Sequence, residues 1–268
     1  MPRFKLTIEY AGTRYSGWQV QKNARTVAGE ILAAAGKAAG GRPLELYGSG
    51  RTDAGVHALA QVAHLDLDTT MRPDALRYAL NDALPADIHV LALERVSHRF
   101  HARRSAQARS YLYQVARRRT AFLKPFVWWI KDPLDAERMR RAAPLFRGLH
   151  DFRSFTQDDP EEKSTEVQVE ALEIADAGDL ILLRIRGSHF VWKMVRRVVG
   201  VLAEVGRGAL AVGDVSRFLR EGSNAPARFT APPSGLFLER VFYEGDRRDW
   251  PLAPALDPAR GASAKVEP

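Results

Sequence analysis

The sequence predicts an α+β fold made of two halves, each with the order strand, helix, strand, strand, helix, strand. Some segments have apolar residues at every second position, and others have them at helical spacing. The same order of segments occurs twice, and 268 residues suffice for one or two domains. This order is the ferredoxin-like unit. We therefore expect two such halves, with a central mixed or antiparallel sheet and a cleft between them.

The first half is predicted to run over residues 1–105. Phe4, Leu6, Ile8 and Tyr10 alternate with polar residues, which predicts a half-buried strand. Thr26 stands at the N-cap of a helix that continues to residue 39. Pro73 opens a second helix. The remaining strands are expected at residues 44–47, 60–67 and 88–96.

The second half is predicted over residues 106–248. Its strands are expected at residues 111–116, 167–174, 180–185 and 236–243. Residues 176–179 read D-A-G-D and predict the hairpin turn between the middle two strands. Helices are expected at 136–146, 191–205 and 215–219. Residues 249–268 are rich in Pro, Ala and Gly, so we expect a loose C-terminal tail.

The composition favours a polyanionic partner. Lys and Arg number 40 against 32 acidic residues, a formal charge of +8, and phosphate contacts supply much of the affinity of proteins for nucleic acid. The chain has no cysteine, which excludes disulfides and thiolate chemistry. The seven histidines are scattered, so no metal site is expected. The first residues lead directly into a strand, without a signal-type or membrane-spanning run, and we expect a cytoplasmic protein.

One loop concentrates the chemistry. Residues 48–58 read G-S-G-R-T-D-A-G-V-H-A, with three glycines, Arg51 and Asp53 between two predicted strands. Glycines permit positive φ and close backbone approach, so they predict a tightly shaped loop. An ionised aspartate held there suits nucleophilic or electrostatic work. The alternative interpretation is a polar hairpin turn with a surface pair between Arg51 and Asp53.

Residues 50–58 resemble the catalytic motif G-R-T-D-A-G-V-H-A of the TruA family of tRNA pseudouridine synthases. The resemblance implies a pseudouridine synthase fold and makes Asp53 the catalytic residue of a uridine isomerisation without a cofactor or a metal. The target uridine would be flipped into the site. The sequence leaves open whether Asp53 attacks C1′ of the ribose or C6 of the base.

Further stretches resemble the same family and imply other site residues. Residues 12–19 and 23–27 are similar to its N-terminal loop. The segment at 109–113 places the family's active-site tyrosine on Tyr111, and K-M-V-R at 193–196 places its arginine on Arg196. A-P-P-S-G-L at 231–236 places Leu236 in the base pocket. Arg51 is expected to contact the flipped nucleotide, and Arg196 to pair with Asp53.

The resemblance further implies a homodimer that binds the anticodon stem-loop of tRNA and modifies positions 38–40. Which tRNAs are modified stays open. Candidate RNA contacts on the basic surface are Arg14, Arg103, Lys193 and Arg197.

Two other functions compete with this interpretation. R-G-S-H-F-V at 186–191 is faintly similar to an RNA-binding submotif, although Ser188 replaces its aromatic residue, so a non-catalytic RNA-binding protein is possible on sequence grounds. D-L-D-T-T at 66–70 matches the D-x-D-x-T of aspartyl-phosphate phosphatases. That chemistry requires a parallel doubly wound sheet, whereas the strands predicted here come in adjacent pairs.

Overall fold

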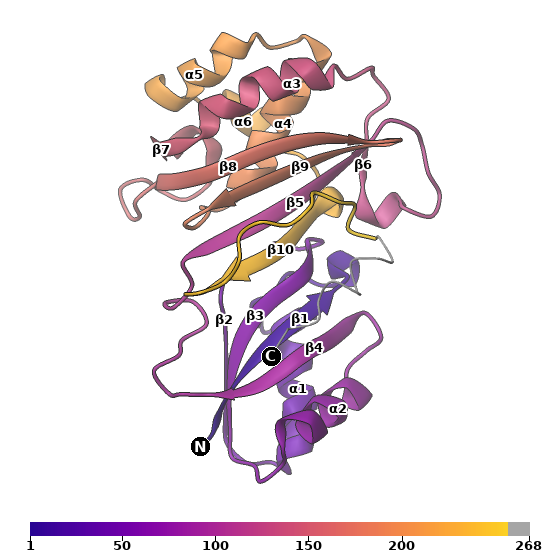
Figure 1. The fold of residues 1–268 in the computed structure, drawn as a ribbon, viewed down its shortest axis with the longest axis vertical. Helices are drawn as coiled ribbons and strands as arrows, with labels where there is room; N and C mark the ends of the chain where they lie inside the picture. Colours follow the sequence, from indigo (N-terminus) through magenta and orange to yellow (C-terminus); the bar gives the residue numbers. More distant parts are fainter. Residues whose placement is uncertain (257–268) are drawn as a thin grey trace. The chain divides into compact units, whose positions relative to one another are not determined.

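The computed structural model describes residues 1–256, which form two compact units (Figure 1). Unit 1 consists of Met1–Arg109 and Leu238–Arg247. Unit 2 consists of Ser110–Phe237 and, among the described residues, 248–256. Most of the predicted tail, residues 257–268, lies outside the described residues.

Unit 1 is an antiparallel sheet with two helices on one face (Figure 1). Strand β1 (Arg3–Tyr10) pairs with both β3 (His57–Leu67) and β4 (Ile88–Val96), and β2 (Leu44–Gly48) pairs with the other edge of β3. The helices are α1 (Val27–Ala39) and α2 (Pro73–Ala83).

Local sequence explains where these elements begin and end. Phe4, Leu6 and Ile8 on alternate positions of β1 are almost completely buried. The Thr26 hydroxyl accepts a hydrogen bond from the amide of Gly29 at 3.3 Å and caps α1. Gly40 ends α1 in the left-handed region, with φ of 60°. The strands and helices predicted between residues 4 and 96 are confirmed, and β3 begins three residues earlier than predicted.

Unit 2 is a mixed sheet with its helices gathered to one side (Figure 1). Strand β8 (Glu166–Ala177) pairs antiparallel with β7 (Gly148–Asp151) and β9 (Leu180–Gly187), and β5 (Ala108–Ala116) pairs parallel with β6 (Trp128–Trp129). The helices are α3 (Ala136–Ala142), α4 (Met194–Arg207), α5 (Val212–Glu221) and α6 (Ala225–Arg228). Short 3₁₀ turns occur at Gly12–Arg14 in unit 1 and at Lys124–Phe126, Ala143–Phe146, Arg153–Phe155 and Pro233–Gly235 in unit 2. Strand β10 (Leu236–Phe242) begins in unit 2 and continues into unit 1.

Two predicted helices extend beyond the observed ones at one end, whereas the helix predicted at 215–219 is longer than predicted, since α5 runs from Val212 to Glu221. The helix predicted to end at residue 146 ends as an α-helix at Ala142, because Pro144 lacks the amide that would continue the hydrogen bonding, and a 3₁₀ turn follows. The helix predicted from residue 191 begins at Met194, because Lys193 adopts φ of 62°. Strands β6 and β7 were not predicted, since each is too short for a periodic pattern.

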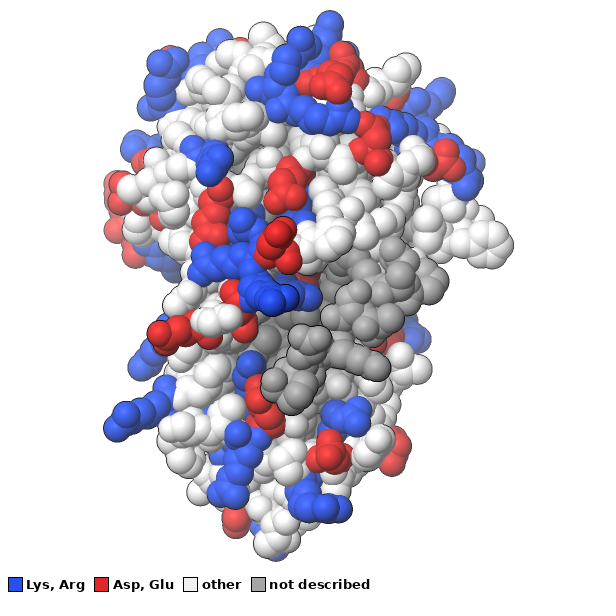
Figure 2. All heavy atoms as spheres, in the orientation of Figure 1, with Lys and Arg blue, Asp and Glu red and all other residues white. Residues whose placement is uncertain are grey.

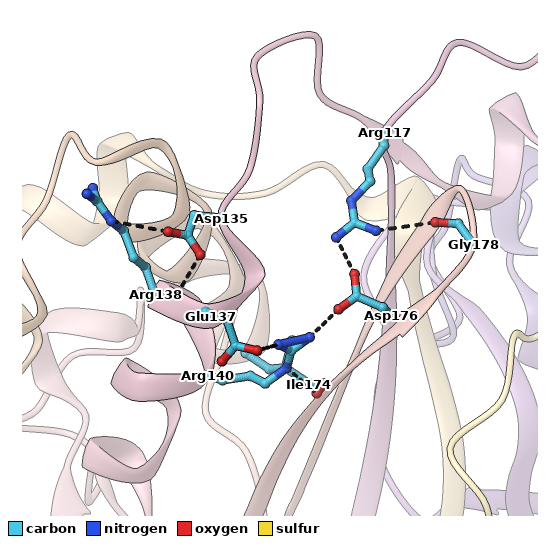
Figure 3. Close-up of polar contacts among 8 residues, drawn as sticks. All are labelled: Arg117, Asp135, Glu137, Arg138, Arg140, Ile174, Asp176 and Gly178. Atoms are coloured by element: carbon cyan, nitrogen blue, oxygen red, sulfur yellow. Dashed lines mark hydrogen bonds and ion pairs between the residues drawn. The ribbon is translucent and has the colours of Figure 1, made fainter.

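An ion-pair network ties α3 to the β8–β9 turn in unit 2 (Figure 3). Asp176 accepts from both Arg117, at the end of β5, and Arg140 of α3, and Arg140 also pairs with Glu137. Partial burial opposes ionisation of Asp176, but the two guanidinium groups lower the pKa of this carboxyl overall. Arg117 also donates to the carbonyl of Gly178 at 3.3 Å, so the end of β5 is fixed to the turn.

Across residues 1–256, no helix combines the length and the apolar composition that a bilayer span requires.

Candidate active site

The loop between β2 and β3 carries Asp53 at its centre. Asp53 is partly exposed, and its carbonyl accepts a hydrogen bond from the amide of Val56 at 3.1 Å, which closes a turn. Gly55 inside this turn has φ of 77°, a conformation that other residues rarely adopt. The predicted tight glycine loop is therefore present.

Backbone hydrogen bonds fix this loop to the segment that follows β1. The amide of Trp18 donates to the carbonyl of Thr52 at 3.1 Å, and the amide of Gly55 donates to the carbonyl of Tyr15 at 3.3 Å. The hydroxyls of Tyr10 and Thr52 lie 2.8 Å apart in the buried interior. The residues on both sides of Asp53 are thus held by main-chain contacts within unit 1.

Two glycines make the close approach possible. A Cβ added to Gly12 would lie 1.9 Å from the carbonyl oxygen of Val56, far inside van der Waals contact. A Cβ on Gly17 would lie 2.5 Å from the carbonyl oxygen of Thr52, and φ of 90° at Gly17 also disfavours a side chain. Glycine is required at both positions because the two segments run in direct backbone contact.

The first residues of the loop are anchored by polar side chains that the sequence analysis missed. The Ser49 hydroxyl donates to Oε1 of Gln61 at 2.7 Å, and Nε2 of Gln61 donates to the carbonyl of Gly50 at 3.2 Å. Arg109 donates to the carbonyls of Ser49 at 3.1 Å and Arg103 at 3.0 Å. Arg109 is the first residue of the 109–113 segment that carries Tyr111, but only the fold reveals that its guanidinium reaches the loop.

The basic residues proposed from sequence in unit 1 differ in their surroundings. Arg51 and Arg103 are exposed, and neither forms an ion pair within residues 1–256. Among the described residues no ion pair of Arg51 is found, although the loop does join two antiparallel strands, β2 and β3, as the hairpin alternative expects. Arg14 donates through two nitrogens to one carboxylate oxygen of Asp87, at 2.7 and 3.0 Å, although its side chain stays 66% exposed.

Asp87 links Arg14 to Tyr15, a residue of the 12–18 segment that contacts the loop. The Tyr15 hydroxyl donates to Asp87 at 2.5 Å. Burial opposes ionisation of Asp87, but the hydrogen bonds from Tyr15 and Arg14 lower the pKa of its carboxyl overall. Burial and the same carboxylate raise the pKa of the Tyr15 phenol. Arg14 thus helps to hold Tyr15, whose carbonyl anchors Gly55.

In unit 2, the predicted aromatic and apolar residues lie on β5 and β10. Tyr111 is half-buried, and its ring meets Phe190 edge-on with centroids 5.1 Å apart. Leu236 is 5% exposed at the start of β10. The residues before Leu236 are fixed by Tyr113, whose hydroxyl donates to the carbonyl of Pro232 at 2.8 Å.

The predicted basic residues of α4 have distinct environments. Arg196 is half-buried, and its Nε donates to the carbonyl of Ala231 at 2.6 Å, beside the Leu236 segment. Arg197 is only 8% exposed and donates to the carbonyls of Ser154 and Thr156. Burial lowers the pKa of Arg197. The guanidinium of Arg197 is buried and bonded to carbonyls inside unit 2, so little of it is accessible to RNA. An RNA contact of Arg197 stays a prediction.

Lys193 has an unusual backbone. It is the only residue other than glycine with positive φ among residues 1–256. The preceding residue is fixed on both sides, since the amide of Trp192 donates to Asp158 at 2.8 Å and its carbonyl accepts from the Thr156 hydroxyl at 3.1 Å. Strained residues of this kind cluster at functional sites. The Lys193 ammonium lies 5.3 Å from the centre of the Trp192 ring.

The phosphatase-like motif has a structural role. Asp66 lies on β3, which pairs antiparallel with β1 and β2, so the parallel sheet of that chemistry is absent at this strand. Arg3 binds both oxygens of Asp66, at 2.7 and 2.6 Å. This pairing, opposed by burial, lowers the pKa of the Asp66 carboxyl. Within residues 1–256, no three His, Asp or Glu side chains are grouped as a metal site requires.

Known proteins resemble this chain over most of its length. A family model described as tRNA pseudouridine synthase matches residues 6–103 and 142–244. The tRNA pseudouridine synthase A of Bradyrhizobium sp. strain BTAi1 is 42% identical over 246 residues, 91% of this chain and 100% of that protein. The protein of the same name from Nitrobacter winogradskyi is 43% identical over 248 residues, 91% and 97% of the two chains. That from Thermoanaerobacter sp. strain X514 is 39% identical over 245 residues, 91% and 100%.

The contact between Gly12 and Val56 generates a prediction. Gly12→Ala should lower the free energy of unfolding by about 2–4 kcal/mol, because one of the two backbone segments must move to accept the new methyl group. Gly50→Ala is the matched control, since a Cβ there meets no atom within 4 Å. Urea unfolding of both variants measures the difference. Equal stabilities would show that the loop is not held as described.

Proposed function

This chain belongs to the tRNA pseudouridine synthase family, and we propose that it acts on the anticodon stem-loop of tRNA, at positions 38–40, with Asp53 as the nucleophile. The family and the relatives at about 40% identity make the chain an isomerase that converts uridine in tRNA to pseudouridine. The family-model match includes Asp53, Arg51, Arg196 and Leu236, whereas Tyr111 lies between its two matched ranges.

The proposed chemistry is an isomerisation that needs no oxidant or reductant. The bond between N1 of uracil and C1′ of the ribose breaks, the base rotates, and a bond from C5 to C1′ forms. The proton on C5 leaves, and N1 gains one, so the atoms balance. The Asp53 carboxylate would attack C1′ or C6 and split this rearrangement into easier steps. We assign no cofactor or metal to the reaction.

The braced loop is the observation that carries the assignment. A nucleophile must be held close to its reacting atom, and a small displacement costs much of the rate. The residues on both sides of Asp53 are fixed by main-chain hydrogen bonds from the 12–18 segment, and Asp53 itself keeps partial exposure. This combination of rigidity and access suits attack on a flipped nucleotide.

The residues proposed to hold the nucleotide follow the family resemblance. We propose that Arg51 contacts the flipped nucleotide, since it is exposed and forms no ion pair within residues 1–256. Tyr111 and Leu236 would contact the base, and Arg196 would hold the Asp53 carboxylate. One observation in unit 2 supports grouping Arg196 with Leu236: Arg196 donates a hydrogen bond to the carbonyl of Ala231, five residues before Leu236.

The basic surface is proposed to bind the RNA backbone. Figure 2 shows Lys and Arg interspersed with acidic residues over the visible face. Individual unpaired cations are therefore better candidates than a uniform basic field, and Arg103 is exposed without an ion pair. Lys193 and Arg14 are further candidates, while Arg197 is the least accessible of the four.

The remaining proposals concern architecture and assembly. The strand order β4–β1–β3–β2 in unit 1 supports a ferredoxin-like half, and we propose two such halves over residues 1–105 and 106–248. We further propose, from the family resemblance, a cytoplasmic homodimer.

The nucleophile is tested by Asp53→Asn, which keeps the side chain's size but removes the carboxylate. Release of tritium from tRNA labelled at C5 of uridine should fall below detection, while tRNA binding persists. Asp68→Asn is the matched control, because Asp68 is an exposed carboxylate at the end of the neighbouring strand and should leave the rate unchanged. Appreciable turnover by Asp53→Asn would contradict the assignment. Binding without turnover in the wild type would favour a passive RNA-binding protein.

The role of Arg196 is tested by Arg196→Lys, which keeps the charge but loses the planar fork and the Nε donor to Ala231. The single-turnover rate should fall by roughly 10- to 100-fold, as expected for the loss of a charge-assisted hydrogen bond. Arg207→Lys, at the far end of the same helix and paired with Glu204, is the control and should react normally. A normal rate for Arg196→Lys would argue against the pairing with Asp53.

The strained backbone at Lys193 allows charge and strain to be separated. Lys193→Ala and Lys193→Gly both remove the ammonium, so both should weaken tRNA binding and lower the log–log salt slope by about 0.7–0.9. Glycine adopts the positive φ of this position without strain, whereas alanine does not. The free energy of unfolding of Lys193→Gly should therefore exceed that of Lys193→Ala by roughly 0.5–1 kcal/mol. Unchanged affinity in both variants would remove Lys193 from the RNA contacts.

A further inference from the structure

We propose that residues 117–131, which comprise the connection from β5 to β6, β6 itself and the two residues after it, form an RNA-binding arm that stacks an unpaired nucleotide of tRNA on Phe122. The arm lies wholly within unit 2. The inference rests on the proposed function only for the identity of the RNA, since the arm's chemistry is argued from its own residues.

Aromatic exposure singles out the arm. Phe122 is 92% exposed, the highest value among the large hydrophobic residues described, and Trp129 near the arm's end is 42% exposed. A single exposed apolar residue is ordinary, but two exposed aromatic rings within the same 15-residue arm are not explained by packing. Aromatic rings bind bases of any sequence, because every base presents a flat face for stacking.

The charge on the arm favours RNA over an apolar protein surface. Residues 117–131 contain five basic residues and no acidic one. Arg117 is paired with Asp176 near the end of β8 (Figure 3), and Arg118 is paired with Asp179 in the β8–β9 turn. Arg119 and Lys124, on either side of Phe122, are exposed and form no ion pair within residues 1–256. Two of the three cations without an ion pair, Arg119 and Lys124, thus lie within three residues of Phe122 in the sequence, and the third, Lys131, ends the arm.

The arm is held in a fixed shape rather than hanging free. At its start, the amide of Arg117 donates to the carbonyl of Asp179 at 2.9 Å. At its end, β6 pairs with β5, and the amide of Ile130 donates to the carbonyl of Ala116 at 3.1 Å. The Arg119 guanidinium lies 5.9 Å from the centre of the Trp129 ring. A preorganised platform loses little conformational entropy when a base stacks on it.

The test measures affinity for a full-length tRNA transcript and, separately, the single-turnover rate at saturating tRNA. Phe122→Ala should weaken binding by roughly 5- to 100-fold, the usual effect of removing one stacking ring, and leave the saturated rate unchanged. Phe122→Leu should not restore affinity, whereas Phe122→Tyr should. Leu149→Ala is the matched control, because Leu149 is 61% exposed on β7 of the same unit.

The charge is tested separately. Arg119→Ala should lower the log–log salt slope by about 0.7, the value for one contact to a single strand. Arg118→Ala removes the same charge from an arginine that is already paired with Asp179, and it should change the slope less.

Each outcome has a distinct meaning. Affinity within twofold of wild type for Phe122→Ala would overturn the proposal. If Phe122→Leu bound tRNA as tightly as wild type, the proposal would also be overturned. The same holds if Phe122→Ala changed the mass of the protein in sedimentation but not its affinity for tRNA, because the arm would then be a protein–protein contact. Failure of the proposed function would appear instead as the absence of tritium release from the wild type, which the affinity measurements do not depend on.

Discussion

The direct backbone contact between residues 12–18 and 52–56 is the constraint on which the rest of the site depends. Main-chain hydrogen bonds cross it in both directions, from Trp18 to Thr52 and from Gly55 to Tyr15. The contact has no room for a Cβ at Gly12. Gln61 and Arg109 anchor the first residues of the loop, but main-chain hydrogen bonds fix the residues on both sides of Asp53, so Asp53 can remain partly exposed and still be held in place. Rigidity of this kind is what a nucleophile needs.

A second feature, in unit 2, positions Arg196, which we propose as a site residue. The Trp192 backbone is held by Asp158 and Thr156, and the next residue enters α4 through the left-handed region. This turn starts the helix so that Arg196 falls one turn later, where its Nε meets the carbonyl of Ala231. The cost of the left-handed conformation is about 1–2 kcal/mol, which the burial of most side chains of α4 offsets. The strained backbone of Lys193 therefore sets the start of α4 and with it the position of Arg196.

Much of the fold and the loop could be predicted from the sequence. The alternation of apolar and polar residues in 4–10 and the Thr26 cap depend only on residues near in sequence, so both could be predicted. The three glycines of residues 48–55 likewise indicate a tight loop without further information. The partners of the loop could not be predicted, because Arg109 and Gln61 reach it only through the fold. The predicted start of α4 was wrong by three residues. Apolar residues recur at helical spacing from Val191 onward, but the backbone of Lys193 is left-handed, so the helix begins only at Met194. Arg197 resembles a surface cation in sequence, but the fold buries it.

The central claim is that this chain isomerises uridine in the anticodon stem-loop of tRNA. The most direct measurement is mapping of pseudouridine in an unmodified tRNA transcript after incubation with the purified wild-type protein, by mass spectrometry after carbodiimide derivatisation, because underivatised pseudouridine has the same mass as uridine. The account predicts pseudouridine at positions 38–40 wherever a uridine stands there, and unmodified uridine elsewhere in the transcript. Pseudouridine confined to another arm of the tRNA, or none at all, would contradict it.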